Sequence, residues 1–95
     1  MVVGVCRVSL RLHDVHSLKD KRSIIKKLIN RTGNRFNASV SETALNDHID
    51  LAEIGIALSG NDPAHVNSTL DRIINFMEEM YLAEISDTDI EVISF

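Results

Sequence analysis

The hydrophobic pattern of this 95-residue chain changes its period several times, and the order of the changes limits the folds that it can adopt. Apolar and polar residues alternate over residues 2–12, which is typical of a strand with one buried face. Apolar residues then recur at helical spacing over residues 25–32, as on the buried side of an amphipathic helix. Alternation returns over residues 36–41 and 52–58, and it predicts two more strands.

The second half of the chain changes once more from strand to helix and back. Asp62 is placed to cap a helix, and Pro63 takes its first position, where the missing N–H has no helical partner to lose. The predicted buried stripe of this helix consists of Val66, Leu70, Ile73, Ile74 and Met77. Residues 89–95 predict a last strand, with Ile90 and Val92 facing the core.

Both ends of the first predicted helix have sequence signals. Ser17 is placed at its N-cap, and the carboxylate of Asp20 is placed to reach back, as in a variant of the capping box. Gly33 and Asn34 predict the end of the helix, because both residues tolerate the left-handed conformation that often follows a last turn.

The predicted order of elements is β-α-β-β-α-β, within a single domain of residues 1–95. A chain of this length can bury one two-layer core. The simplest arrangement of these elements around one core is a four-stranded antiparallel sheet in the order 4-1-3-2 with both helices on one face. We therefore predict an α+β fold of the ferredoxin-like type.

Composition excludes several classes of protein. The chain is 44% hydrophobic and 25% charged, and no apolar run is long enough to cross a bilayer, so we expect no membrane contact. Cys6 is the only cysteine, which rules out an internal disulfide and a thiolate metal cluster. The strand pattern places Cys6 in the core as a small hydrophobe. We expect a reducing, cytoplasmic setting.

A net charge of −4 hides a strong segregation of charge along the chain. Residues 19–35 contain seven basic residues against Asp20 alone, a net charge of +6. Residues 36–95 contain twelve acids and only Arg72 as a cation, a net charge of −11. A partner responds to this distribution and not to the average.

The basic segment allows two interpretations. One is the solvated outer face of a helix, which needs a polar side. The other is a surface for an anion or RNA, because the segment lacks the acids that a solvated face usually interleaves with its lysines. The candidate anion- or RNA-binding residues are His16, Lys19, Lys21, Arg22, Lys26, Lys27 and Arg31.

Lys21 is the unusual member of this set, because it falls inside the apolar arc of the predicted helix. Its stem allows the ammonium to snorkel outwards or to pair with a loop acid such as Asp47 or Asp50. Alternatively, Lys21 joins Lys19, Arg22 and the free N–H groups of the first turn around a bound anion.

The face of the sheet without helices is predicted to be a poor surface for RNA. It lacks exposed aromatic residues on which bases stack, and its acids repel phosphate. We expect Arg7 and Arg11 to pair with Glu53, Asp89 or Glu91 on the flanking strands.

The same face has a predicted apolar corner, where the start of the first strand meets the end of the fourth. The residues brought together there are Val3, Val5, Ile93 and Phe95, with Ala57 nearby. Because a contiguous exposed apolar cluster suggests a partner surface, we expect a homodimer through this corner.

Three histidines are expected at one end of the sheet: His13, His16 and His48. His65 lies at the opposite end. No ligand spacing fixes these side chains, so we expect neither a metal nor a cofactor. The chain has no nucleophile–base pair, glycine-rich phosphate loop or close carboxylate pair, so no catalytic residue is assigned.

The segments HSLKDKRSIIKKLINRTGNRFNASVSE and AEIGIALSGNDPAHV resemble the YlxP-like family, small bacterial domains of uncharacterised function. The resemblance covers nearly the whole chain. The matching positions are His16, Ser17, Leu18, Lys19, Lys21, Arg22, Phe36, Asn37, Glu42, Ile54, Gly55, Asn61, Asp62 and His65. Ile49 departs from the family, which often has tryptophan there. The resemblance implies a ferredoxin-like fold and a gene setting beside translation and ribosome-maturation factors.

These observations lead to three hypotheses. The first is a non-enzymatic module that binds RNA or a ribonucleoprotein through its basic first helix. The second is a dimeric protein-interaction or small-ligand-binding domain that uses the apolar corner. The third is an enzyme that acts on a phosphorylated substrate at the His16 end, and it ranks last because positioning alone is not a catalytic site.

Overall fold

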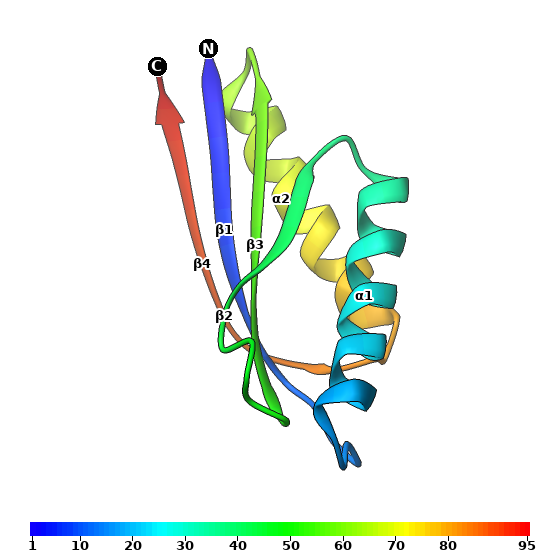
Figure 1. Cartoon of the computed structure of the whole chain (residues 1–95). Helices are drawn as coiled ribbons and strands as arrows, with labels where there is room; N and C mark the ends of the chain where they lie inside the picture. Colours follow the sequence, from blue (N-terminus) through cyan, green and yellow to red (C-terminus); the bar gives the residue numbers. More distant parts are fainter.

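The computed structural model describes all 95 residues and contains four strands and two helices (Figure 1). In chain order these are β1 (Val2–Arg11), α1 (Leu18–Arg35), β2 (Ser39–Ala44), β3 (Leu51–Gly60), α2 (Pro63–Glu79) and β4 (Glu84–Ser94). Neither helix combines the length and the apolar character that a membrane span requires.

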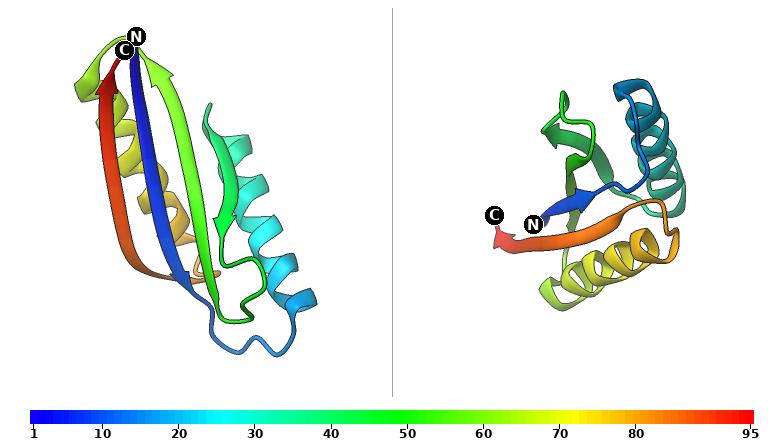
Figure 2. Two further views of the ribbon diagram at one scale, coloured as in Figure 1. Left: turned by 60° about the vertical axis from the view of Figure 1, so that its left-hand side comes forward. Right: turned by 90° about the horizontal axis from the view of Figure 1, so that it is seen from below.

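The four strands form one antiparallel sheet in the order β2-β3-β1-β4. Both helices cover the same face of this sheet, and the other face is open (Figures 1 and 2). This is the ferredoxin-like topology predicted from the order of hydrophobic periods. β4 forms one edge of the sheet, where only its β1 side is paired.

The core lies between the sheet and the two helices, and it follows the alternation in the sequence. Its buried apolar residues are Val2, Cys6, Val8, Leu10, Leu12, Ile25, Leu28, Ala52, Ile54, Ile56, Val66, Leu70, Ile73 and Met77. Gly4 lets α2 approach β1 closely, because a Cβ at Gly4 would lie 2.5 Å from Val66 Cγ1.

The predicted core position of Cys6 is confirmed, since its exposed fraction is 2%. Burial raises the pKa of the Cys6 thiol, and the negative charges of Asp89 and Asp71 act in the same direction, against a backbone hydrogen bond at Asp89. A protonated thiol at neutral pH is a poor nucleophile, so Cys6 has a packing role.

Both predicted N-cap residues cap their helices, but the carboxylate of Asp20 makes no return hydrogen bond to Ser17, so the predicted capping box is only half formed. Ser17 Oγ accepts a hydrogen bond from the Asp20 backbone N–H, with 3.1 Å between the heavy atoms. At the second helix, Asp62 Oδ1 accepts from the backbone N–H of Ala64 at 3.2 Å. These bonds satisfy N–H groups that have no partner within the first helical turn.

The predicted end of the first helix at Gly33 and Asn34 is wrong, because α1 continues to Arg35. No glycine in the chain has a positive φ, so Gly33 is an ordinary helical residue. The helix ends when Phe36 turns extended and donates its backbone N–H to the Thr32 carbonyl at 3.0 Å. β2 consequently begins at Ser39 and not at Phe36.

β4 begins at Glu84, five residues before the predicted start at Asp89. The pairing with β1 shifts between Ser9 and Leu10, and this irregularity leaves one extra residue in β4. Such a bulge interrupts the alternation of apolar and polar residues, so the first half of β4 does not show the pattern of a strand.

Candidate nucleic-acid interface

α1 turns one line of residues into the core and exposes the opposite side to solvent. Lys21, Ile25, Leu28 and Thr32 are its buried positions, at the i, i+4, i+7 and i+11 spacing of one helical face. Thr32 fits this apolar line because its hydroxyl donates to the Leu28 carbonyl at 2.7 Å. The sheet therefore dictates which side of α1 a partner can reach.

The exposed side of α1 has a row of cations without acidic partners. Its exposed basic residues are Lys19, Arg22, Lys26, Lys27, Arg31 and Arg35. Neither the two ion pairs of lysine or arginine with a carboxylate nor the His13–Glu84 contact involves these residues. Asp20 is the only acid in the helix, and it lies in the first turn. The charge of this surface is thus not neutralised within the chain.

Lys21, by contrast, does not belong to this surface, and its assignment to the anion-binding set is wrong. Its side chain is fully buried, and its ammonium donates to the Leu45 carbonyl at 2.6 Å. The ammonium also lies 3.1 Å from Glu42 Oε2, which accepts no hydrogen bond and is held by charge. An ammonium engaged in this way cannot reach a phosphate.

The partner of Lys21 is Glu42 and not Asp47 or Asp50, which are both exposed. Glu42 lies on the same face of β2 as Val40, in the row that faces the helices. An acid at an inward position was the sequence signal for this pair, because charged residues at buried positions are usually paired.

Lys21 also orders the turn between β2 and β3. Leu45 adopts a positive φ of 63°, which is costly for a residue with a branched side chain. Its carbonyl accepts from both Lys21 Nζ and the backbone N–H of His48. The buried lysine thereby connects α1 to the loop at the edge of the sheet.

The histidines are not gathered into a metal-ligand group. His13 Nε2 lies 3.0 Å from Glu84 Oε2 on β4, while His16 and His48 are exposed. No group of three or more histidine, cysteine or acidic side chains is arranged to hold a metal ion. His16 directly precedes the N-cap residue Ser17 of α1 and is exposed.

Two further arginines belong to the helical surface, although the sequence argument did not select them. The Arg35 guanidinium lies 5.9 Å from the centre of the Phe76 ring on α2, and the Arg72 guanidinium lies 5.8 Å from the Phe36 ring. The two rings pack edge to face with centres 5.6 Å apart. Arg72 is isolated among acids in the sequence, so only the packing of α2 on α1 associates it with the basic helix.

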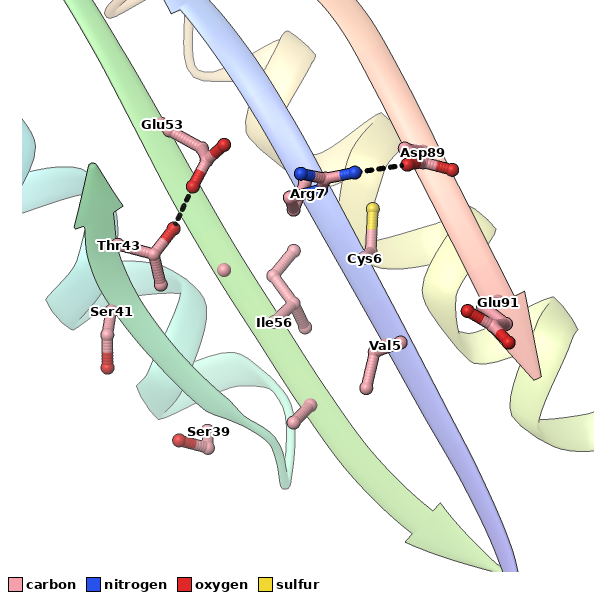
Figure 3. Close-up of a pocket in the computed structure, with 12 residues that line it drawn as sticks. Val5, Cys6, Arg7, Ser39, Ser41, Thr43, Glu53, Ile56, Asp89 and Glu91 are labelled. Carbon is pink, nitrogen blue, oxygen red and sulfur yellow. Dashed lines mark hydrogen bonds and ion pairs between the residues drawn. The ribbon is translucent and has the colours of Figure 1, made fainter. Parts of the chain in front are cut away.

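The open face of the sheet contains a shallow hollow of about 530 Å³, shown in Figure 3. Arg7 is one of the residues that line it and pairs with Asp89 of the neighbouring strand at 2.7 Å, which confirms the expected cross-strand pair. Thr43 donates a hydrogen bond to Glu53, and no ion pair forms at Arg11. The lining contains no aromatic side chain and three carboxylates, so this face does not suit nucleic acid.

The predicted apolar corner is present on the same face. β1 pairs with β4 so that Val3 lies opposite Ile93, and with β3 so that Val5 lies opposite Ala57. Ile93 is 42% exposed and Phe95 is 90% exposed. The backbone groups of Met1 and Phe95 are hydrogen-bonded to one another, so both chain ends lie at this corner (Figure 1).

Comparison with known proteins establishes the family. Residues 3–90 match the model of the family described as "Protein of unknown function (DUF503)", and the chain belongs to this family. It is 29% identical over 77 residues to "Uncharacterized protein YlxP" of Bacillus subtilis (strain 168), an alignment that covers 81% of this chain and 84% of that protein. The resemblance to the YlxP-like family is thereby confirmed.

Among solved structures, the de novo designed protein Foldit4 is similar with a TM-score of 0.51. The alignment covers 99% of this chain and 97% of that chain at 13% sequence identity. At this identity the similarity concerns the arrangement of strands and helices alone.

Proposed function

We propose that the outer surface of α1 binds structured RNA, alone or within a ribonucleoprotein particle. The observation that carries the proposal is the row of six exposed cations on α1, none of which has an acidic partner. An isolated solvated helix usually offsets its lysines with acids at i+3 or i+4, and α1 does not. Phosphate groups supply the missing negative charge.

The distribution of charge supports the same proposal. The chain as a whole has a net charge of −4, so a non-specific attraction of the entire molecule to RNA is not expected. The carboxylates Glu53, Asp89 and Glu91 lie on the open face of the sheet, on the other side from the helices (Figure 3). RNA is therefore oriented toward the helical layer.

The test is the affinity for a structured RNA over a series of salt concentrations. If about six phosphates are contacted, affinity falls by about 10³-fold between 50 and 200 mM salt. The double variant Lys26→Glu/Lys27→Glu is expected to weaken binding and to flatten this salt dependence.

A matched control changes the same amount of charge on the opposite face, in the variant Arg7→Glu/Arg11→Glu. It is expected to retain the affinity of the unchanged protein, with the fold of both variants checked by circular dichroism. Equal loss of binding in the two double variants contradicts a site on α1. Absence of RNA binding at low salt, with capture of an acidic protein by α1 instead, also overturns the proposal.

A second candidate is a homodimer through the apolar corner, favoured by the exposure of Ile93 and Phe95. A contiguous apolar patch of this kind is often a partner surface. Sedimentation equilibrium of the unchanged protein and of Ile93→Asp tests it. A dimer that becomes a monomer in the variant supports this candidate, and a monomer at all concentrations rejects it.

A further inference from the structure

The outward side of α1 contains an uncharged polar strip. Ser23, Asn30 and Asn34 are all exposed, and at about 100° per residue they lie within about 40° of one another on the helix. This direction is about opposite to that of the buried line of α1. The strip is therefore the part of α1 that is farthest from the sheet.

Two lines of cations flank this strip. The first line consists of Lys19, Arg22 and Lys26, and the second consists of Lys27, Arg31 and Arg35. Each line is centred about 70–80° away from the strip, on opposite sides. A helix with its side chains is about 10–12 Å wide, so the two lines suit two separate rows of phosphates better than a single strand.

α1 is not a free helix that projects from the domain. It packs beside α2 in one layer, as Figures 1 and 2 show, and Arg72 of α2 lies over Phe36 at the end of α1. The major groove of B-DNA is about 8.5 Å deep, and it suits a helix that projects from its domain better than a flat layer of two helices. The minor groove of A-form RNA is wide and shallow and accommodates such a flat helical layer.

The helical layer also lacks a pair of exposed rings on which successive bases could stack. Phe36 and Phe76 pack against each other, and each of them is covered by a guanidinium group. Phe95 and Tyr81 are exposed, but Phe95 lies at the corner of the sheet where the chain ends meet, and Tyr81 lies in the turn between α2 and β4, at the other end of that strand. Single-stranded nucleic acid is usually bound by stacking of bases on aromatic rings, so this surface favours a duplex.

We infer that α1 binds A-form duplex RNA across its minor groove. The two lines of cations contact the phosphates of the two strands, and Ser23, Asn30 and Asn34 contact the 2′-hydroxyl groups between them. A carboxamide both donates and accepts hydrogen bonds and a hydroxyl does so too, which matches the 2′-hydroxyl group. This inference rests on the proposed function and specifies its ligand.

The first experiment compares four probes by fluorescence anisotropy at one salt concentration. The probes are an RNA duplex of about 16 base pairs, a DNA duplex of the same sequence, the single RNA strands, and the RNA duplex with 2′-O-methyl groups. We expect the unmodified RNA duplex to bind at least about tenfold more tightly than the other three.

The second experiment separates the strip from the cations. The variant Asn30→Ala/Asn34→Ala is expected to lose the preference for RNA duplex over DNA duplex while it keeps the salt dependence. The matched control is Asn67→Ala/Asn75→Ala, which removes two exposed amides from α2. Alanine is the best helix former, so both variants are expected to fold.

The outcomes distinguish this inference from the proposed function. Equal binding of RNA and DNA duplexes, with loss of both in Lys26→Glu/Lys27→Glu, keeps the RNA-binding surface and rejects minor-groove recognition. Tighter binding of the single strands rejects it as well. No binding of any probe at low salt rejects both the inference and the proposed function.

Discussion

The two sides of α1 place positive charge in opposite environments. On the side that faces the sheet, Lys21 is completely buried and engaged by Glu42 and the Leu45 carbonyl. On the outward side, Lys26 and Lys27 are exposed and have no acidic partner. These lysines lie within six positions of one another on the same helix.

The comparison shows that residue type alone does not distinguish a structural lysine from one available to a partner. A buried ammonium needs a carboxylate and hydrogen-bond acceptors, because its transfer from water is expensive. An exposed ammonium retains its water and remains free to exchange it for a phosphate oxygen. Substitutions on the side of α1 that faces the sheet should therefore affect the stability of the fold, and substitutions on its outward side should affect the binding of a partner.

Lys21→Ala is expected to have the largest effect on stability. It leaves the Glu42 carboxylate partly buried without its partner, and removal of one member of a buried pair costs about 3–5 kcal/mol. Urea denaturation measures the loss. The control Lys27→Ala is expected to change the free energy of unfolding by no more than about 0.5 kcal/mol.

A double-mutant cycle identifies the source of this loss. Lys21→Met/Glu42→Gln removes both charges, so neither group is left buried without its partner. The loss of stability in this double variant is therefore expected to be smaller than the sum of the losses in Lys21→Met and Glu42→Gln. Strict additivity of the two single changes would show that Lys21 and Glu42 do not interact in solution.

Gly4 and Gly33 give the next contrast, between a glycine at the interface of β1 with α2 and a glycine at an exposed position of α1. Gly4→Ala forces a Cβ to within 2.5 Å of Val66 Cγ1 and is expected to destabilise the fold by about 1–3 kcal/mol. Gly33 lies within α1 with nothing within 4 Å of an added Cβ. Gly33→Ala should instead stabilise by about 0.5–1 kcal/mol. Thermal unfolding compares the two variants, and equal shifts of the same sign contradict the packing of α2 on β1.

Removal of the cap of α1 is expected to have an intermediate effect. Ser17→Ala abolishes the hydrogen bond to the Asp20 N–H and should cost about 1 kcal/mol. Ser68→Ala, at an exposed position within α2, serves as its control and should leave both the stability and the RNA affinity close to unchanged. A loss of RNA affinity in Ser17→Ala beyond its loss of folded protein would assign the hydroxyl a direct contact.

The smallest effect concerns pH and Cys6. Because burial raises the pKa of the native thiol, the native protein keeps this proton at pH values where the unfolded chain releases it. The contribution of Cys6 to the free energy of unfolding is therefore constant at neutral pH, and it declines as the pH rises above about 8.5, where the thiol of the unfolded chain ionises. Denaturation at several pH values measures the decline, and Cys6→Ala should remove it. An identical decline in Cys6→Ala assigns the pH dependence to other groups.

Much of the fold could be predicted from the sequence because its signals are local. Alternation and helical spacing depend on neighbouring residues, and they predicted all six elements and the order of the sheet. The caps at Ser17 and Asp62 were predictable for the same reason, since a cap contacts N–H groups only two or three residues away. The errors occurred where a distant contact overrides a local signal, as at Phe36, which packs on Phe76 of α2.

The candidate site was less predictable. The exposed basic residues of α1 follow from helical geometry, and the open face with its Arg7–Asp89 pair follows from strand register. Lys21 was placed in the apolar arc correctly, but its partner was not identified, because Glu42 is contributed by the edge strand. Arg72 could not be associated with α1 before the two helices were packed together.

The sequence by itself determined the types of the elements, the residues of the core and the segregation of charge, because these properties arise from periodicity and composition. Only the tertiary structure decided which cations remain free. Burial of Lys21 against Glu42, the position of Arg72 over Phe36 and the layer that α1 forms with α2 all depend on contacts between segments distant in the chain. The energy of a charge depends on the solvent and partners around it, and those are established only when the segments pack.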